Sequence, residues 1–276
     1  MGEQAGEQRL QPASGDSGNL CVSSRTRSRK EMDRERVREV KGADSGSGSA
    51  RMELSTLDGL HAMVPQMSGG ISISFSEVAK RYDLRVVFRA VSGEAQPGEV
   101  LVITGPNGSG KSTLLSILCG LLRPTRGEVL YRSADGGNLT RDAWGRHLGV
   151  VAPSMAVYEE LTALENLRFY ARVRGLASAD ADHRKLLERV GLDPERKTPV
   201  RGYSTGMAQR LKIAQALLHD PAVLFLDEPS SNLDPTGQDW LEECVRSLLE
   251  EARTIVLATN DRREMTWGSR NVSLAG

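Results

Sequence analysis

Gly105-Pro-Asn-Gly-Ser-Gly-Lys-Ser-Thr113 is the stretch of sequence that decides the fold. It matches the phosphate-binding pattern G-x-x-x-x-G-K-[ST]. A short apolar run precedes it at residues 99–104, and a sequence with good helical character follows it at 112–121. In a strand–loop–helix unit of this kind, the glycines of the loop let backbone N–H groups converge on phosphate oxygens, and the helix adds its positive end to the same site. The stretch therefore predicts a P-loop.

The P-loop supplies most of the predicted nucleotide contacts. Lys111 is expected to reach the β- and γ-phosphates, and the Ser112 hydroxyl is expected to ligate Mg²⁺. The alternative is a glycine-rich turn that matches by accident, and the strand and helix on either side of the loop argue against it. The predicted nucleotide-binding residues of the loop are Gly105, Pro106, Asn107, Gly108, Ser109, Gly110, Lys111, Ser112 and Thr113.

A second functional stretch is Val223-Leu-Phe-Leu-Asp-Glu-Pro229, an apolar run that ends in two acids. Open α/β sheets bind ligands at the carboxyl ends of their strands, so both carboxylates are expected at the phosphate site. Asp227 is expected to hold magnesium through water, and Glu228 to polarise the water that attacks the γ-phosphate. Two acids after a strand are more often a solvated turn, but the presence of the P-loop favours a Walker B motif.

Helical and strand-like patterns alternate along the rest of the chain. Residues 71–82 alternate apolar and polar side chains as an edge strand does, and a second strand is expected at 85–92. Helices are expected at 161–174, 180–190 and 207–219, and buried parallel strands at 223–226 and 254–258. This alternation predicts an α/β domain with a mainly parallel sheet.

Residues 1–69 differ in composition from the rest of the chain. They are rich in Ser, Gly, Arg and Glu, and charges of both signs alternate between Arg25 and Arg38. Such a segment cannot bury enough apolar surface to order itself, so a disordered extension is expected, followed by one domain over 70–276. The alternatives are that Arg25–Arg38 forms a solvated helix or a basic docking arm, and that Met67 is the true start.

Composition argues against several classes of function. Lys plus Arg equals Asp plus Glu at 36 each, so no overall charge attracts nucleic acid, and no nucleic-acid partner is expected. Cys21, Cys119 and Cys244 match neither a disulfide framework nor a metal-binding spacing, which favours a reducing cytosol. The longest apolar runs are far shorter than the roughly 20 residues that span a bilayer, so membrane contact is expected to come through another protein.

A third motif connects the chain to a known family. Tyr203-Ser-Thr-Gly-Met207 stands just before a predicted helix and before the Walker B motif, and it resembles the LSGGQ-like signature of ABC-type ATPases. The resemblance covers residues 71–276. It implies an α/β fold of the P-loop NTPase class, with an ABC-type ATPase core, an antiparallel β edge and a helical subdomain at about 155–205. It also implies binding of ATP and Mg²⁺, and hydrolysis of ATP.

The resemblance assigns roles to residues outside the P-loop. Four signature residues would contact ATP bound to the P-loop of an opposing subunit: Ser204, Thr205, Gly206 and Met207. Asp234 corresponds to the D-loop, which links the two sites of the dimer. Tyr82 corresponds to the aromatic residue that stacks on adenine, and the alternative for Tyr82 is core packing.

Two positions depart from the family pattern. The implied catalytic residues are Glu228, Lys111 and the residue after the strand at 254–258, where the family has a switch histidine and this chain has Asn260. An amide can donate a hydrogen bond to phosphate but cannot titrate, so hydrolysis is expected to be slow. The family's Q-loop glutamine aligns with Pro153, or with Ser154 if the alignment shifts, and neither side chain carries an amide.

The resemblance also implies partners. Two ATPase subunits, identical or related, would close head to tail around two ATP molecules and act with integral-membrane permease subunits on the cytoplasmic face of the cell membrane. Residues 158–174 are aromatic and leucine-rich on one face, and in the family this region receives the membrane partner. The alternative for this segment is an ordinary amphipathic core helix.

Several functions are compatible with these motifs. The signature and the phrase at 158–176 are similar to the haem-exporter ATPases of cytochrome c maturation, which rank first, and to the ATPases of drug and polysaccharide exporters. A catalytically weak regulatory subunit is favoured by Asn260 and Pro153 and opposed by the intact Lys111, Asp227 and Glu228. Soluble ABC proteins of translation or DNA repair carry two cassettes or a long coiled-coil insertion, and neither is evident.

Overall fold

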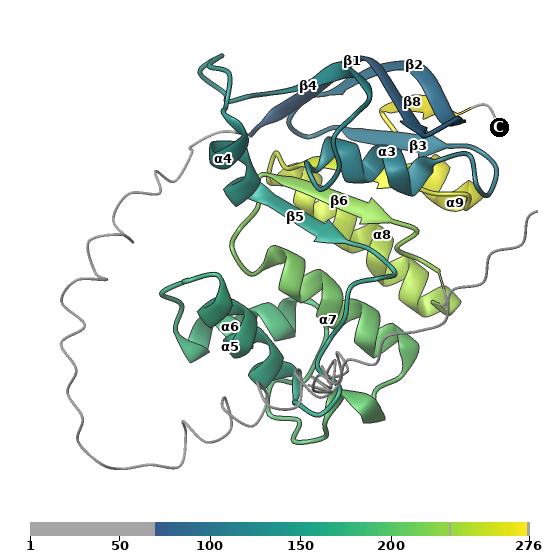
Figure 1. Cartoon of the computed structure of the whole chain (residues 1–276). Helices are drawn as coiled ribbons and strands as arrows, with labels where there is room; N and C mark the ends of the chain where they lie inside the picture. Colours follow the sequence, from purple (N-terminus) through teal and green to yellow (C-terminus); the bar gives the residue numbers. More distant parts are fainter. Residues whose placement is uncertain (1–69, 232, 275–276) are drawn as a thin grey trace, which may run out of the picture. The chain divides into compact units, whose positions relative to one another are not determined.

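The computed structural model describes residues 70–231 and 233–274. Residues 1–69 lie outside this part, so the disordered extension, the alternatives for Arg25–Arg38 and the start at Met67 stay predictions. The described strands form two sheets, and helices pack on both faces of the larger one (Figure 1). Within the described ranges, no helix combines the length and the apolar character that crossing a bilayer requires.

The larger sheet is parallel and has five strands in the order β5-β6-β7-β3-β8. Its strands are β3 (Val100–Thr104), β5 (Leu148–Val151), β6 (Val223–Asp227), β7 (Thr254–Ala258) and β8 (Arg270–Ser273). β7 lies between β3 and β6 and pairs with both. Because all five strands run in the same direction, the loops that follow β3, β6 and β7 leave the sheet at one edge, where α/β sheets bind ligands.

Seven helices and two 3₁₀ turns accompany these strands in the described residues. They are α3 (Lys111–Leu118), α4 (Arg141–Trp144), α5 (Ala163–Val173), α6 (Asp180–Arg189), α7 (Thr205–Leu217), α8 (Pro235–Glu250) and α9 (Arg262–Met265), with η2 (Gly145–His147) and η3 (Val200–Gly202). The helices expected at 161–174, 180–190 and 207–219 are confirmed as α5, α6 and α7, with ends that differ by at most two residues.

Two hydrophobic clusters lie on opposite faces of the parallel sheet. In β3, Leu101 and Ile103 belong to the cluster that contains α3 and the smaller sheet, whereas Val100 and Val102 belong to the cluster that contains α7 and α8. Successive side chains of a strand point to opposite faces, so a strand covered on both faces must be apolar throughout. This explains why the strands were recognisable as continuous apolar runs.

The smaller sheet is antiparallel and has three strands in the order β2-β1-β4. They are β1 (Ser72–Tyr82), β2 (Arg85–Ala95) and β4 (Arg126–Arg132). The prediction that β1 is an edge strand is wrong, because β4 pairs with it along the side opposite β2, with Ile73 opposite Tyr131. One face of β1 is buried, and this one-sided burial produced the alternating pattern that was interpreted as an edge.

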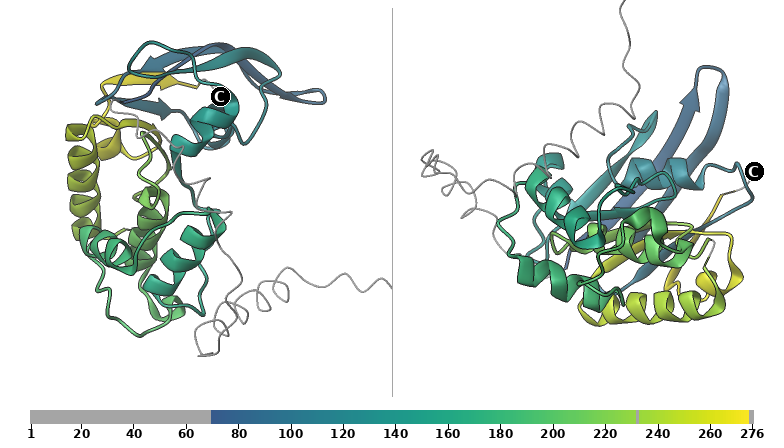
Figure 2. Two further views of the ribbon diagram at one scale, coloured as in Figure 1. Left: turned by 90° about the vertical axis from the view of Figure 1, so that its left-hand side faces the viewer. Right: turned by 90° about the horizontal axis from the view of Figure 1, so that it is seen from below.

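Helices α5, α6 and α7 fall between β5 and β6 in the chain and pack against one another. Figure 2 shows them on the side of the parallel sheet away from the antiparallel strands. Helix α5 begins with a capping box, in which Thr162 accepts from the backbone N–H of Glu165 and the Glu165 carboxylate accepts from that of Thr162. The segment at about 155–205 therefore contains two complete helices, and its role as a separate subdomain stays a prediction.

Candidate nucleotide site

The P-loop connects the end of β3 to the start of α3, as predicted. Gly110 caps the helix with φ near +100°, a conformation that L-residues with a side chain rarely adopt. A Cβ atom at this position would lie 2.5 Å from Cγ1 of Val87, and one at Gly105 would lie 2.6 Å from the carbonyl oxygen of Leu274. Both glycines are therefore required by close packing. The first turn of α3 carries no acidic residue, so its N-terminus can face an anion.

Lys111 is the buried cation of this loop, with 5% of its side chain exposed. Its ammonium group donates to the carbonyl oxygen of Gly105 at 3.1 Å and lies 3.5 Å from that of Pro106. The same nitrogen lies 3.8 Å from Oε1 of Glu228, at the end of β6. The predicted phosphate-binding cation and the acid predicted to polarise the attacking water are thus side by side.

Asp227 and Glu228 lie at the carboxyl end of β6 and have different environments. Asp227 is 8% exposed, and its Oδ1 atom has no hydrogen-bond partner among the described residues. Burial raises the pKa of Asp227, while the Ser112 hydroxyl and Lys111 lower it and Glu228 raises it further. Glu228 has φ near +47°, and its N–H donates to the carbonyl oxygen of Ala258 at 2.8 Å. This backbone bond fixes an uncommon conformation that presents the half-exposed carboxylate.

The residues at this edge fit a magnesium ion that is shared with a nucleotide. No group of three or more His, Cys, Asp or Glu side chains that could hold a metal occurs in the described part of the chain. Mg²⁺ is usually bound by only one or two carboxylates together with substrate phosphates. Asp227 offers an unpaired, buried carboxylate oxygen next to the Ser112 hydroxyl, and this donor set suits such a site.

Asn260 follows β7 and reaches the P-loop. Its Nδ2 atom donates to Oδ1 of Asn107, 153 positions earlier in the chain. The structure therefore brings the predicted switch position to the same loop as Lys111, and the side chain there is an exposed, neutral amide. Asn260 makes this contact through its side-chain N–H, and the same N–H could donate a hydrogen bond to a phosphate oxygen.

The signature residues lie at the start of α7. Ser204 caps the helix and its hydroxyl accepts from the backbone N–H of Met207 at 3.2 Å. A Cβ atom at Gly206 would meet nothing closer than 3.7 Å, so the helix start is open. Thr205, like Ser204, is exposed. Helices α3 and α7 pack on opposite faces of the parallel sheet. The P-loop, which precedes α3, and the signature, which starts α7, therefore belong to helices on different sides of the sheet.

Helix α7 is nevertheless tied to the acidic end of β6. The side-chain amide of Gln209 donates to the carbonyl oxygen of Pro229 at 2.8 Å.

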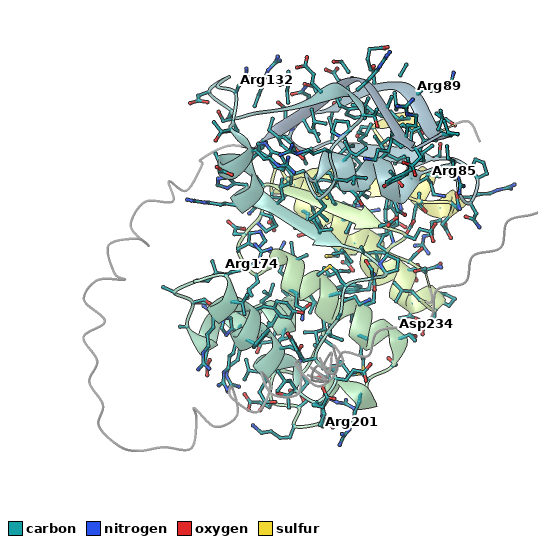
Figure 3. All side chains as sticks on the ribbon, viewed as in Figure 1. Arg85, Arg89, Arg132, Arg174, Arg201 and Asp234 are labelled. Carbon is teal, nitrogen blue, oxygen red and sulfur yellow. The ribbon has the colours of Figure 1, made fainter. Side chains whose placement is uncertain are left out.

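Asp234 caps α8 by accepting from the N–H of Gly237 at 2.8 Å, and Figure 3 shows it at the start of that helix. Asp234 itself is exposed, and Asn232, two residues earlier, lies outside the described residues.

Tyr82 ends β1 at the β1–β2 hairpin. The residue is 50% exposed, and the ammonium group of Lys80 lies 4.8 Å from the centroid of its ring. The neighbouring Leu84 is 96% exposed. The alternative of core packing is therefore wrong for Tyr82, and its stacking on adenine stays a prediction.

The predicted Q-loop positions lie shortly after β5, which ends at Val151. Pro153 and Ser154 are both exposed, and the carbonyl oxygen of Pro153 accepts from the ammonium group of Lys212 on α7 at 3.3 Å. In α5, which begins at Ala163, Leu167 and Phe169 are buried, so the apolar face of this helix packs inward as the core-helix alternative expected. Docking of a membrane partner on the exposed part of 158–174 stays a prediction.

Sequence reasoning missed one buried acid at this edge. Glu264 on α9 is 1% exposed and contacts both Ser230, two residues after Glu228, and Thr259, just before Asn260. A single Glu in the polar stretch DRREM carries no signal of burial. Only its contacts in three dimensions identify it.

A P-loop beside an acid-ended parallel strand defines a nucleotide-binding protein of the P-loop NTPase class. The sequence profile described as ABC transporter matches residues 88–231. The chain belongs to the ABC transporter family.

Individual relatives support this assignment. The chain is 38% identical over 194 residues to Nod factor export ATP-binding protein I of Burkholderia thailandensis, covering 70% of this chain and 64% of the relative. It is 33% identical to the linearmycin resistance ATP-binding protein LnrL of Bacillus subtilis, covering 68% of this chain and 61% of the relative. It is also 33% identical to the lantibiotic transport ATP-binding protein SrtF of Streptococcus pyogenes, covering 68% and 80%. The chain thus spans less than two thirds of the length of the first two relatives.

A solved structure supports the fold. The dimeric ATP-binding cassette MJ0796 in a post-hydrolysis state with ADP and Pi superposes with a TM-score of 0.64 at 28% identity, covering 73% of this chain and 94% of that chain. The predicted fold, an ABC-type ATPase core of the P-loop NTPase class, is confirmed.

Proposed function

We propose that this chain is the ATP-hydrolysing subunit of a membrane exporter. The observation that carries the proposal is the 3.8 Å separation between Nζ of Lys111 and Oε1 of Glu228, which joins the phosphate-binding loop to a carboxylate at the end of the neighbouring acidic strand. Family membership and the names of the relatives, which refer to export, resistance and transport, support the same function.

Each residue of the site would have its own role in phosphoryl transfer. The P-loop backbone and Lys111 would hold the β- and γ-phosphates, and Tyr82 would stack on adenine. Glu228 would accept a hydrogen bond from the attacking water, which orients that water in line with the γ-phosphate. Asp227 and Ser112 would hold Mg²⁺, which neutralises charge on the phosphate oxygens when bound. Asn260 would donate its amide N–H to the γ-phosphate, without any change in protonation.

A second ATPase subunit completes the site in this proposal. Ser204, Thr205, Gly206 and Met207 would bind the γ-phosphate held by the partner's P-loop, and Asp234 would lie between the two sites. The open start of α7 and its position in a different layer from α3 support such an arrangement. The solved relative MJ0796 is itself described as a dimer.

We also propose that the ATPase works on permease subunits at the cytoplasmic face of the membrane. The docking surface would include the exposed residues near Pro153 and Ser154 and the exposed part of 158–174. For the cargo, haem export and a role in cytochrome c biogenesis find no support in the names of these relatives. Export of a drug-like or saccharide cargo, the alternative expected from the sequence, takes its place.

A catalytically weak regulatory subunit is a second candidate. Asn260 favours it, because its amide contacts Asn107 in the P-loop and cannot supply the positive charge of an imidazolium. Such a subunit would bind ATP and would close with a partner without turning over at this site.

Trapping of a closed dimer tests the proposed function. Glu228→Gln removes the carboxylate that would activate water but keeps the side-chain volume. In saturating MgATP, the full-length variant is expected to elute from a size-exclusion column as an ATP-dependent dimer, whereas wild type stays mainly monomeric because it hydrolyses its ATP. Glu243→Gln, which changes an exposed acid on α8, is the matched control and should behave as wild type. A Glu228→Gln chain that binds ATP and stays monomeric would contradict the proposal.

A further inference from the structure

Glu264 is a buried carboxylate that the proposed reaction does not use directly. It lies on the four-residue helix α9, with 1% of its surface exposed. Removing a carboxylate from water is costly, and buried acids are normally retained only where they are hydrogen-bonded. The partners of Glu264 therefore indicate what it contributes.

Both oxygens of the Glu264 carboxylate accept hydrogen bonds, each from a different loop. Oε1 accepts the backbone N–H of Ser230 at 3.0 Å. Oε2 accepts the hydroxyl of Thr259. Ser230 stands two residues after Glu228, and Thr259 immediately precedes Asn260. One side chain thus joins the loop that presents the water-activating acid to the segment that presents the switch amide.

The two segments are otherwise held by backbone bonds at the ends of their strands. The N–H of Glu228 donates to the carbonyl oxygen of Ala258 at 2.8 Å, and the N–H of Thr259 donates to that of Ile103 at 3.1 Å. The Thr259 hydroxyl also accepts the N–H of Asp261 at 2.9 Å. Beyond these strand ends, the Glu264 carboxylate bonds to both loops within the part of the chain that the structure describes.

Burial of the Glu264 carboxylate is compensated in part by these contacts. Burial raises its pKa, the bonds from Thr259 and Ser230 lower the pKa, and the nearby Asp261 raises it. Ser230 is 7% exposed and Thr259 is 1% exposed, so both bonds are shielded from competing water. Shielded bonds of this kind give a rigid connection.

We propose that Glu264 is a positioning residue for ATP hydrolysis: its two-sided hydrogen bond sets the spacing between Glu228 and Asn260, so that both face one γ-phosphate. The inference rests on the proposed hydrolytic function. Glu264 does not touch the nucleotide in this account. Its loss should therefore lower kcat while leaving the binding of ATP to the P-loop and Tyr82 almost unchanged.

Two substitutions test the connection from opposite ends. Glu264→Gln keeps the shape and can still accept from Ser230, but its NH₂ group faces Thr259 as a donor, so the Thr259 hydroxyl can no longer donate to residue 264. Thr259→Val removes that hydroxyl and keeps the volume. Each is expected to lower the kcat of the full-length ATPase about ten-fold, with KM for ATP within about two-fold of wild type. The double variant should be no slower than the slower single variant, because both changes remove the bond that Thr259 donates to Glu264.

The chain offers a matched control for a purely structural effect. Thr254 lies at the other end of the same strand β7, is fully buried, and donates its hydroxyl to the carbonyl oxygen of Ile71 at 2.5 Å. Thr254→Val makes the same chemical change as Thr259→Val, far from the loops of the site. It removes one buried hydrogen bond, so it should lower the melting temperature and leave kcat unchanged.

The outcomes separate this inference from the proposed function. If wild type hydrolyses ATP, Glu228→Gln does not, and Glu264→Gln and Thr259→Val lower kcat while Thr254→Val does not, the positioning role stands. If the two variants lose only thermal stability, as Thr254→Val does, the positioning role is overturned and the proposed function stands. If wild type itself has no turnover, both are overturned. Should Glu264→Gln fail to fold, Thr259→Val alone decides between these outcomes.

Discussion

Replacing Gly110 with alanine should destabilise the fold and abolish the nucleotide site together. Gly110 has φ near +100°, and a Cβ atom there would lie 2.5 Å from Cγ1 of Val87 and 2.9 Å from Cδ1 of Phe88. The backbone conformation costs an alanine about 1–2 kcal/mol. The clash adds about 1–3 kcal/mol, because Phe88 belongs to the core and cannot move freely. The sum is about 2–5 kcal/mol.

Thermal unfolding and ATP binding measure this effect. For a domain of this size, each kcal/mol lowers the melting temperature by about 2–4 °C, so Gly110→Ala should unfold roughly 4–20 °C below wild type. Binding of ATP should be lost, because the substitution displaces the residue that caps α3. Gly136→Ala is the matched control: φ there is near +84°, but no atom lies within 4 Å of the added Cβ.

The control isolates the two contributions to the cost. Gly136→Ala should show only the backbone cost and unaltered ATP binding. If Gly110→Ala melts at the same temperature as Gly136→Ala, the close approach of β2 to the P-loop does not have the energetic importance inferred from the structure.

Three further predictions concern Asn260, Tyr82 and His219. Asn260→His should raise kcat several-fold and introduce a dependence on pH near 6.5, which kcat measured from pH 5.5 to 8.5 would reveal; a flat profile would argue that Asn260 does not face the γ-phosphate. Tyr82→Ala should raise KM for ATP about ten-fold with little change in melting temperature, since the ring is half-exposed and base stacking contributes about 1–3 kcal/mol; an unchanged KM would remove Tyr82 from the site. Burial lowers the pKa of His219 from 6.5 to about 4, so between these pH values the folded state binds fewer protons than the unfolded state. The free energy of unfolding should therefore be highest above pH 6.5 and should fall, by at most about 3 kcal/mol, as the pH is lowered toward 4. Urea unfolding at pH 7.5 and pH 5 measures this, and in His219→Gln the difference between the two pH values should shrink.

The local parts of the nucleotide site could be predicted from the sequence. The P-loop is contiguous, its glycines and Lys111 have fixed spacing, and the strand and helix on either side have simple apolar patterns. The acids of β6 follow a run of apolar residues that is buried on both faces. In these cases the chemistry and the local structure are encoded in the same few neighbouring residues.

Features that depend on distant pairing could not be predicted in this way. Strands β5 and β8 have four residues each, too few for a pattern, and β4 is recognised only by its pairing with β1. Because β4 pairs with it, β1 lies at the centre of its sheet and not at the edge that the sequence had predicted. Helix α8 was missed because its first residues were interpreted only as a D-loop, although Asp234 followed by Pro235 is also a typical helix start.

Contacts within the site that join remote segments were also beyond the sequence. The bond between Asn107 and Asn260 spans 153 positions, and the burial of Glu264 results from packing between two loops. Neither position carries a pattern in its own neighbourhood. The sequence showed that Asn260 stands where the family has a histidine, and the structure shows that the Asn260 amide contacts Asn107.

The steady-state rate of ATP hydrolysis tests the central claim most directly. The full-length chain should be assayed as wild type, Glu228→Gln and Glu243→Gln, with and without its membrane partner. We predict that wild type and Glu243→Gln release phosphate at equal rates, and that Glu228→Gln reduces the rate by at least a hundred-fold while still binding ATP. A wild-type chain that binds ATP and releases no phosphate, even with the partner present, would contradict the account and favour the regulatory subunit.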